Sequence, residues 1–464
     1  MEQVVKRSGG RGTASLSRSA RSWAMYQGGR DTYIIIVGTY IFIPYFATSV
    51  VGDPVRGQSL IALYNLISGL IVTFTAPFLG AAVDRLGARK PWMLLLTALS
   101  APLIGLLWFA APNGAILTPG MLVVMFVAIS VLLSYGEVVY GAMLPEAATF
   151  SEQARASGLA LSLGNFVSIF VMLALLGLLL PDVQSAIGLD AIPGGADRFS
   201  VVLVALCLIG GTIPLLRHSN DAPRSGISFV SALESGAVDL VNLIRHAKLP
   251  PNALLYLLAR MLYVDGKMAL LIFGGVYAAG VMQWGPTELI VLGLIVTVAG
   301  VLGGVFGGWL DTWFGPKRAL EIEIAVTLLC AVTQLGITPD TVFFLWHADP
   351  DGFALNLPIF HSAPEITYIA VAVVLSVFGT ASWASSRTLM ARLAPHDQLG
   401  TFFGLYGLSG VATVWAAPLG IEFVTRTFES QRAGLAPASA FMLAGLIVLF
   451  FVRGGGRQIQ SIQE

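Results

Sequence analysis

The chain has 464 residues, of which 56% are apolar and only 11% are charged, whereas charged residues make up about a quarter of an ordinary globular protein. A soluble chain this poor in charge could not cover its own surface. The formal net charge is zero, so no basic patch indicates nucleic acid as a partner, and the two cysteines and five histidines suggest neither a disulfide framework nor a metal cluster. We expect no metal and no cofactor.

The N-terminal segment 1–22 is rich in Ser, Gly and Arg and is predicted to be a disordered cytoplasmic tail. Long apolar runs follow it. Each can cross a bilayer as a helix, because about 20 apolar residues span the hydrocarbon core and only a helix satisfies the backbone there. Six such runs form a predicted N-terminal bundle over residues 23–216, namely 23–51, 59–83, 92–112, 119–143, 157–180 and 199–216.

A polar segment, 217–252, links this bundle to a second one over residues 253–452. Apolar and polar residues alternate within the linker from Phe229 to Arg245, which is typical of an amphipathic helix on the membrane surface, although a plain connection remains open. The spans of the second bundle are 253–281, 288–310, 319–337, 365–388, 399–424 and 436–452. The expected fold class is an all-α membrane protein of twelve transmembrane helices in two pseudo-symmetric six-helix bundles.

The distribution of basic residues predicts the orientation, because Lys and Arg are retained in the cytoplasm during membrane insertion. Both tails and one set of connections are rich in them, and residues 453–464 form the second cytoplasmic tail. The opposite connections hold only Arg56, Arg198, Arg426 and Arg432. Both termini are therefore expected in the cytoplasm. The loop 338–364 is expected outside, either as a lid or as a passive connection.

A sequence motif occurs twice, close to half the chain apart, which is the sign of an internally duplicated transporter. Both copies place a glycine four residues before an aspartate, followed by a glycine turn and a basic pair. Small residues let helices approach closely, and an aspartate at a helix end can meet the positive N-terminus of a neighbour. The first copy contains Gly80, Asp84, Arg85, Gly87, Arg89 and Lys90, and the second contains Gly307, Asp311, Gly315, Lys317 and Arg318.

The first copy resembles the signature loop of the major facilitator superfamily, G-x-x-x-D-R-x-G-x-R-K, at each of its six fixed positions. The second copy lacks the arginine after Asp311 and has one extra residue before Gly315. The resemblance implies the major facilitator fold and a gating role for this loop.

A narrower resemblance is to the branch that includes the autophagy-related vacuolar amino-acid effluxers and their bacterial relatives. It implies amino-acid export. The first span departs from that branch, because residues 26–31 read Tyr-Gln-Gly-Gly-Arg-Asp where those relatives usually show Tyr-Asp-Trp-Ala-Asn-Ser. The stretches that carry the resemblance are 52–58, 140–146, 258–266, 274–280 and 402–410.

Ionisable residues inside the bilayer are candidates for the transport pathway, because each costs several kcal/mol unless it faces water or a partner. The seventh span holds Arg260, Asp265 and Lys267, and Asp265 lies roughly 18 Å from the start of the span, near the bilayer centre. We expect Asp265 to bind a proton or an ion partner, and Gly266 could allow a local break that brings Arg260 and Asp265 nearer to each other.

Arg30 and Asp31 occupy a matching place in the first span, where they are expected to face the second pair across the molecule. Arg260 or Arg30 would meet a substrate carboxylate or phosphate, and Tyr40, Tyr263 and Tyr277 would line the path. The alternative is that the charges only neutralise one another between the halves.

These features predict a secondary active transporter that moves a small polar solute by alternating access, coupled to a proton or ion gradient. The expected partners are this solute, membrane lipid and a proton or cation, and the chain is expected to be a monomer in a bacterial inner membrane. No G-x-x-x-x-G-K-[ST] stretch for ATP and no H-E-x-x-H stretch is present. A transporter-like receptor or assembly partner and a membrane-embedded enzyme remain the alternatives.

Overall fold

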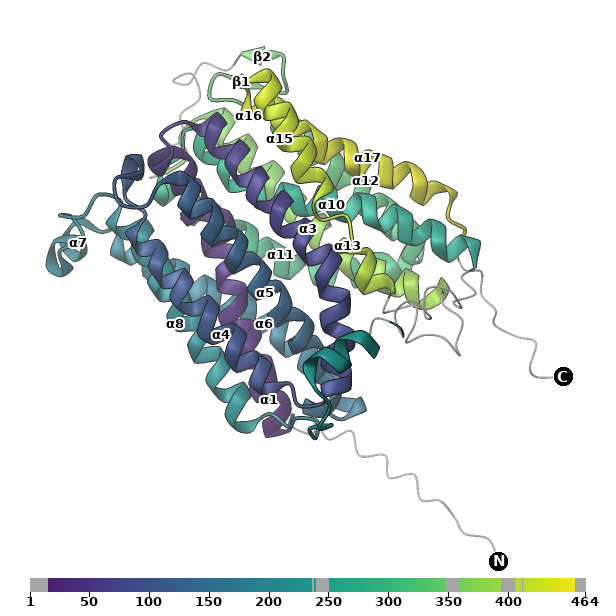
Figure 1. Cartoon of the computed structure of the whole chain (residues 1–464). Helices are drawn as coiled ribbons and strands as arrows, with labels where there is room; N and C mark the ends of the chain where they lie inside the picture. Colours follow the sequence, from purple (N-terminus) through teal and green to yellow (C-terminus); the bar gives the residue numbers. More distant parts are fainter. Residues whose placement is uncertain are drawn as a thin grey trace, which may run out of the picture.

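The computed structural model describes residues 16–235, 238, 250–347, 359–393, 405–410 and 412–454, and its regular structure is almost entirely helical (Figure 1). The strands within the described residues, β1 (Thr341–Val342) and β2 (Trp346–His347), pair antiparallel in the predicted external loop. The rest of the polar linker, 236–237 and 239–249, and residues 348–358 of that loop lie outside the described part.

The first span begins earlier than its hydropathy indicates. Helix α1 (Arg18–Thr32) starts five residues before the expected position, because the Ser17 side chain accepts a hydrogen bond from the Ala20 amide and caps it. The last residues of the predicted tail are therefore helical. The span continues through a wide π-helical stretch η1 (Tyr33–Tyr40), the short α2 (Phe42–Tyr45) and a second π-helical stretch η2 (Phe46–Val50). Such irregular turns occur frequently at functional sites.

Five long helices complete the first half, and proline or a side-chain cap marks the start of four of them. Pro54 and Pro119 occupy the first helical position, where the missing N–H costs nothing, and the Asp53 carboxylate accepts from the amides of Val55 and Arg56. The long helices are α3 (Pro54–Leu86), α4 (Lys90–Leu106), α5 (Pro119–Ala147), α6 (Phe150–Leu178) and α8 (Gly195–His218), with short elements η3 (Leu107–Phe109), η4 (Pro112–Gly114) and α7 (Pro181–Ile187) between them.

Most helices of the second half also begin with proline or a side-chain cap. Its helices are α10 (Pro251–Gly280), α11 (Pro286–Phe314), α12 (Pro316–Leu335), α13 (Ala363–Leu393), α15 (Ala416–Phe428), α16 (Gln431–Gly434) and α17 (Ala436–Phe451). Residues 405–409 are also helical, while 394–404 and 411 lie outside the described part.

Nine helical segments in the described residues are long and apolar enough to cross a membrane. They are Arg18–Val50, Pro54–Val83, Lys90–Phe109, Pro119–Ala147, Leu159–Leu178, Gly195–His218, Pro286–Phe314, Ala363–Met390 and Gln431–Phe451. Helices α10 and α12 occupy predicted spans as well, but each carries at least three ionisable residues, and the eleventh predicted span is only partly described. Large apolar side chains such as Phe74 and Phe166 are exposed on the outside, as lipid-facing side chains are.

Most helix packing occurs within one half of the chain (Figure 1). In the first half α1 packs on α6 and α8, α3 packs on α5, and α4 packs on α5 and α8. In the second half α11 packs on α13, α10 on α17, and α12 on α13. The halves meet where α15 packs on α3, α11 on α6 and α10 on η1.

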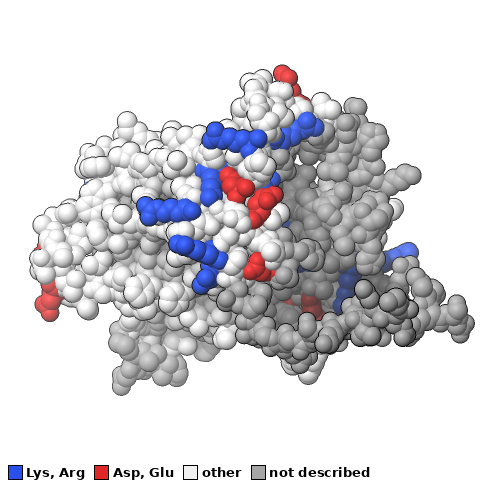
Figure 2. Space-filling view, turned by 90° about the horizontal axis from the view of Figure 1, so that it is seen from below, with Lys and Arg blue, Asp and Glu red and all other residues white. Residues whose placement is uncertain are grey.

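The start of α1, the turn between α3 and α4 and the end of α8 lie together at the lower end of the molecule (Figure 1). The carboxylate of Asp221, in the linker, accepts hydrogen bonds from the amides of Arg89 and Lys90. Farther along the linker, residues 229–235 are helical, and Phe229 packs on Trp92 with 5.1 Å between ring centroids. Figure 2 shows Lys and Arg side chains gathered on this face beside a few acidic ones.

Candidate functional site

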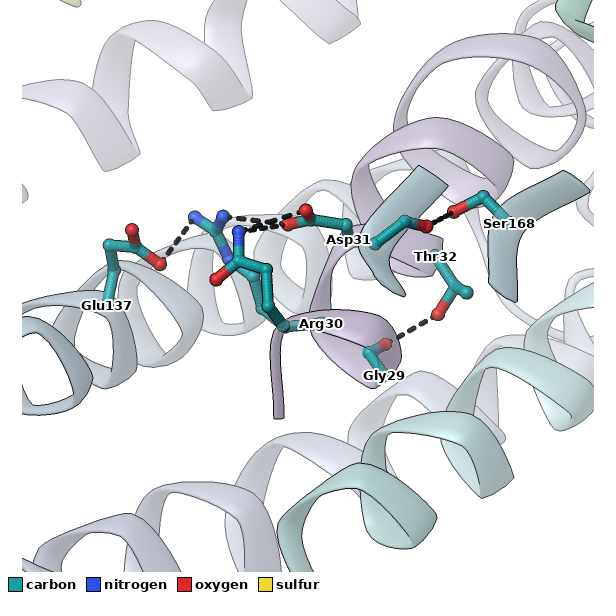
Figure 3. Close-up of polar contacts among 8 residues, drawn as sticks. Gly29, Arg30, Asp31, Thr32, Glu137 and Ser168 are labelled. Carbon is teal, nitrogen blue, oxygen red and sulfur yellow. Dashed lines mark hydrogen bonds and ion pairs between the residues drawn. The ribbon is translucent and has the colours of Figure 1, made fainter. Parts of the chain in front are cut away.

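A polar cluster joins α1 and α5 in the first half of the chain (Figure 3). The Arg30 guanidinium lies 3.1 Å from Asp31 Oδ1 and 3.2 Å from Glu137 Oε2. The Gln27 amide donates to both oxygens of Asp31, at 2.8 and 2.9 Å. One cation thus meets two carboxylates, and the cluster carries a formal charge of minus one when all three are ionised.

Glycines bring the helices around this cluster close together. A Cβ atom at Gly164 of α6 would collide with the Asp31 carboxylate, and one at Gly29 of α1 would collide with the backbone of Cys207 in α8. Ser168 donates to the Gly164 carbonyl at 2.7 Å, so its hydroxyl is satisfied within its own helix (Figure 3). Close approach through small residues is a general device of membrane helices. Here it fixes where Asp31 lies.

Arg260 and Asp265 of the second half do not pair with each other in the described structure. Arg260 Nη1 donates to the Tyr406 carbonyl at 2.6 Å and to Ser409 Oγ at 2.8 Å, and its guanidinium lies 3.6 Å from the centroid of the Tyr406 ring. Asp265 Oδ2 accepts from the backbone amide of Ala417, at 2.9 Å, where α15 begins. Both side chains are buried inside the protein and do not point at lipid.

The local break that Gly266 could have allowed is absent, since α10 runs as one helix from Pro251 to Gly280. Gly266 instead allows α17 to approach, because a Cβ atom there would collide with the carbonyl of Ala438. Among the described residues Arg30 and Arg260 each find partners in their own half, so the two charged groups do not meet across the molecule. Whether these residues act in transport stays a prediction.

A cavity of about 170 Å³ lies among η1, α10, α11, α12 and α13, and Lys267 is the one charged side chain in the described lining. Lys267 Nζ donates to Ser382 Oγ at 2.7 Å and to the Gly379 carbonyl at 3.2 Å. It also lies 3.6 Å from the centroid of the Trp383 ring. The other aromatic lining residues are Tyr40 and Tyr368. The cavity is therefore largely apolar with a single buried cation.

The three tyrosines expected along the path lie in different places. Tyr40 lines the cavity, as expected. Tyr263 shares a hydrogen bond with Ser386 at 2.8 Å, and Tyr277 donates to the carbonyls of Gln334 and Ile337, so neither belongs to the described lining.

Sequence reasoning counted Lys267 as ionisable but gave it no role, and it did not identify the serines of α13. The sequence could have revealed these serines by their spacing. They stand at positions 382, 385 and 386 of one span, which puts three hydroxyls within about one helical turn. Lys267, Glu323 and Tyr263 each contact one of these serines. The serines therefore form the polar centre of the second half.

The predicted gating loop is a tight turn that the linker covers. Gly87 has a φ of 79°, and a Cβ atom there would collide with the carbonyl of Pro223. Gly80 faces Val138 of α5, and Arg85 lies in the last turn of α3. The side chain of Asp84 lies outside the described part, and Asp311 of the second copy is half-buried near the end of α11.

Comparison with known proteins finds transporters. A family model described as vacuole effluxer Atg22 like matches residues 146–455. An uncharacterised MFS-type transporter of Bacillus subtilis (strain 168), YxiO, is 20% identical over 447 residues, covering 94% of this chain and 95% of its own. The lactose permease of Lactobacillus helveticus is 31% identical over 155 residues, which is 30% of this chain and 24% of the permease.

Solved structures share the fold along nearly the whole chain. A mutant of the nucleoside transporter NupG has a TM-score of 0.62 at 11% identity and covers 93% of this chain and 98% of its own. The D-xylose-proton symporter has a TM-score of 0.60 at 15% identity and covers 94% of this chain and 98% of its own. At these identities the similarity concerns the fold alone.

Proposed function

The chain belongs to the family of Atg22-like vacuole effluxers and is an integral membrane transporter of the major facilitator type, and we propose that it moves a small carboxylate, such as an amino acid, by alternating access. The family description supports efflux as the direction. A proton or ion gradient would drive the movement, which makes the protein a secondary active transporter.

The environment of Lys267 is the observation that supports a carboxylate as cargo. The side chain is only 7% exposed, and its nearest described partners are a hydroxyl, a carbonyl and an aromatic ring, none of which carries a negative charge. Burying a cation that has no directly bonded counter-charge is costly. A cargo carboxylate that enters the cavity would supply this counter-charge, while Tyr40 and Trp383 would contact the apolar part of the cargo.

Two six-helix bundles with twelve spans form the proposed frame of this movement. Support comes from helices at eleven of the twelve predicted positions, from a described part of the remaining one, and from packing that stays mostly within each half. The first half holds a charged cluster of its own, formed by Arg30, Asp31 and Glu137. We infer a role for it in positioning cargo or in switching between states.

Exchange transport in proteoliposomes tests the proposal. Purified protein is reconstituted with unlabelled amino acids inside, and entry of a mixture of radiolabelled amino acids is measured without a pH gradient. We expect exchange by the wild-type protein, loss of at least tenfold in Lys267→Met, and unchanged exchange in Arg426→Met, which alters an exposed arginine of α15. Labelled amino-acid amides, which lack the carboxylate, should not exchange.

Other outcomes would contradict the proposal. Binding of amino acids without any flux would favour a receptor or an assembly partner, and chemical conversion of the amino acid would favour a membrane-embedded enzyme. Equal exchange by Lys267→Met and the wild-type protein would remove the role of Lys267.

We also propose a monomer in a bacterial inner membrane with both termini in the cytoplasm. The lower face supports this orientation, because it gathers Lys and Arg side chains and lies at the described start of the chain (Figure 2). A fluorescent protein fused to the C-terminus should be fluorescent in cells, whereas a periplasmic alkaline phosphatase fusion at the same place should be inactive.

A further inference from the structure

A second buried charge, Glu323 of α12, lies on the other side of the serines that hold Lys267. Its side chain is 0% exposed. Oε1 accepts a hydrogen bond from Ser385 Oγ at 2.9 Å, and Oε2 has no hydrogen-bond partner among the described residues. An ionised carboxylate that is this deeply buried and holds one hydrogen bond is costly, whereas the neutral acid is not.

The charged groups around Glu323 come from two helices. Lys267 of α10 attracts the carboxylate and Asp311 of α11 repels it, while α13 contributes the Ser385 hydroxyl. Helix α17, which also packs on α12, has no ionisable side chain. Arg260 and Arg387 act in turn on Lys267. The Ser385 hydroxyl and, after it, the charge on Lys267 therefore favour the ionised form of Glu323.

Lys267 and Glu323 are connected through α13 rather than by a direct ion pair in the described structure. Lys267 binds Ser382 and Glu323 binds Ser385, and these serines are three positions apart, on neighbouring turns of one helix face. The two charges thus share one polar strip, with Lys267 on the cavity side. A change of charge at Lys267 therefore changes the electrostatic free energy of the ionised Glu323 carboxylate.

We propose that Glu323 is the proton site of this transporter and that Lys267 links it to the cargo. This inference rests on the proposed function. When a cargo carboxylate binds Lys267, it neutralises the cation that favours ionised Glu323. A proton from water then binds Oε2, forming an O–H bond, and it leaves again when the cargo leaves.

The coupling has a fixed sign. Cargo and proton favour each other's binding, and this coupling is reciprocal by linkage. They therefore cross the membrane in the same direction, and efflux coupled in this way runs when the compartment being emptied is the more acidic one.

Two assays in proteoliposomes separate proton coupling from cargo movement. The first is exchange of radiolabelled amino acids at equal pH on both sides, which needs no net proton movement. The second is accumulation of the same amino acids driven by a pH gradient. For Glu323→Gln we expect exchange within about twofold of the wild-type rate and a loss of at least tenfold in gradient-driven accumulation.

Glu321→Gln is the matched control. Glu321 lies two residues away on α12 but pairs with Lys317 at 3.0 Å near the surface, so both assays should match the wild-type protein. Accumulation by Glu323→Gln at the wild-type level would overturn the inference.

Proton uptake by the wild-type protein tests the inference even if Glu323→Gln folds poorly, because it does not need that variant. In weakly buffered detergent solution with a pH indicator, adding amino acids to the wild-type protein should remove protons from solution, and adding them to Glu321→Gln should do the same. Amino-acid binding by the wild-type protein without proton uptake would overturn the inference but leave the proposed function intact. Absence of any exchange by the wild-type protein would instead contradict the proposed function.

Discussion

The side-chain amide of Gln58 in α3 donates a 2.9 Å hydrogen bond to the hydroxyl of Thr425 in α15, which joins the two halves of the chain. The same amide donates to the carbonyl of Gln431, and the Gln431 side chain donates in return to the carbonyl of Pro54. Gln58 is fully buried in this contact. The two halves are therefore held together at the ends of α3 and α15 by specific bonds as well as by apolar packing.

Gln58→Leu should loosen this contact. Two hydrogen bonds are lost, at about 0.5–1.5 kcal/mol each, so separation of the halves at this end should become about 5 to 160 times more frequent. Double electron–electron resonance between spin labels on α3 and α15 measures the population of the separated state. Gln184→Leu, which removes a glutamine bonded within the first half, should leave the distance distribution unchanged.

Gly164→Ala should disturb the polar cluster of α1 without touching its charges. The new methyl group would collide with the Asp31 carboxylate and move it away from Gln27 and Arg30. We expect amino-acid exchange to fall at least tenfold if this cluster serves transport. Gly177→Ala on the same helix has open space around it and should exchange normally. Wild-type rates in both variants would assign the cluster a purely structural role.

Gly87→Ala should destabilise the turn between α3 and α4. The loss of stability should be larger than the cost of placing alanine at a positive φ, because the new Cβ atom also collides with a neighbour. A positive φ costs a non-glycine residue about 1–2 kcal/mol. Gly226 also has a positive φ, of 75°, but has nothing within 4 Å of an added Cβ atom, so Gly226→Ala reports this backbone cost. The Gly87 variant must in addition displace the Pro223 carbonyl. Melting temperatures in detergent should fall farther for Gly87→Ala, and equal falls would contradict the contact.

The carboxylate of Glu152 gives the start of α6 a pH-dependent attachment to the start of α1. It accepts hydrogen bonds from the Thr149 hydroxyl and amide and from the Ser17 amide, and these bonds, the Thr149 hydroxyl first, lower the pKa of Glu152 below its usual value. A depressed pKa in the folded state stabilises the protein above the unfolded value of about 4.3, and this contribution disappears as pH falls through the folded pKa.

Glu152→Gln should therefore melt at a lower temperature than the wild-type protein at pH 7. The difference should shrink as the pH falls below about 4, where the wild-type carboxyl also becomes neutral. Scanning fluorimetry across this range provides the measurement. Glu146→Gln, at an exposed position near the end of α5, serves as the control and should show no such pH-dependent difference.

Hydropathy and the repeated motif predicted most helices, the family and the turn at Gly87, because spans and tight turns leave a signal in local sequence. The partners of buried charges leave no such signal in the local sequence, because they come from distant parts of the chain. The carboxylate of Asp265 finds a backbone amide 152 positions away, and the cavity role of Lys267 depends on Ser382 and Trp383 from another helix. The partners of Arg30 and Arg260, Glu137 of α5 and the Tyr406 carbonyl, could not be predicted for the same reason, since position within a span does not specify the neighbour.

The hydrogen bond between Asp265 and Ala417 also limits which parts of the molecule can shift separately. Helix α15 has 13 residues, a length of about 20 Å, which is shorter than the roughly 30 Å hydrocarbon core of a bilayer, so we expect it to begin inside this layer. Its first amides would have no water to bind there. Sliding α10 past α15 would leave the Ala417 amide without a hydrogen-bond partner in the hydrocarbon layer. We therefore expect α10 and α15 to move together in any rocking of the second half.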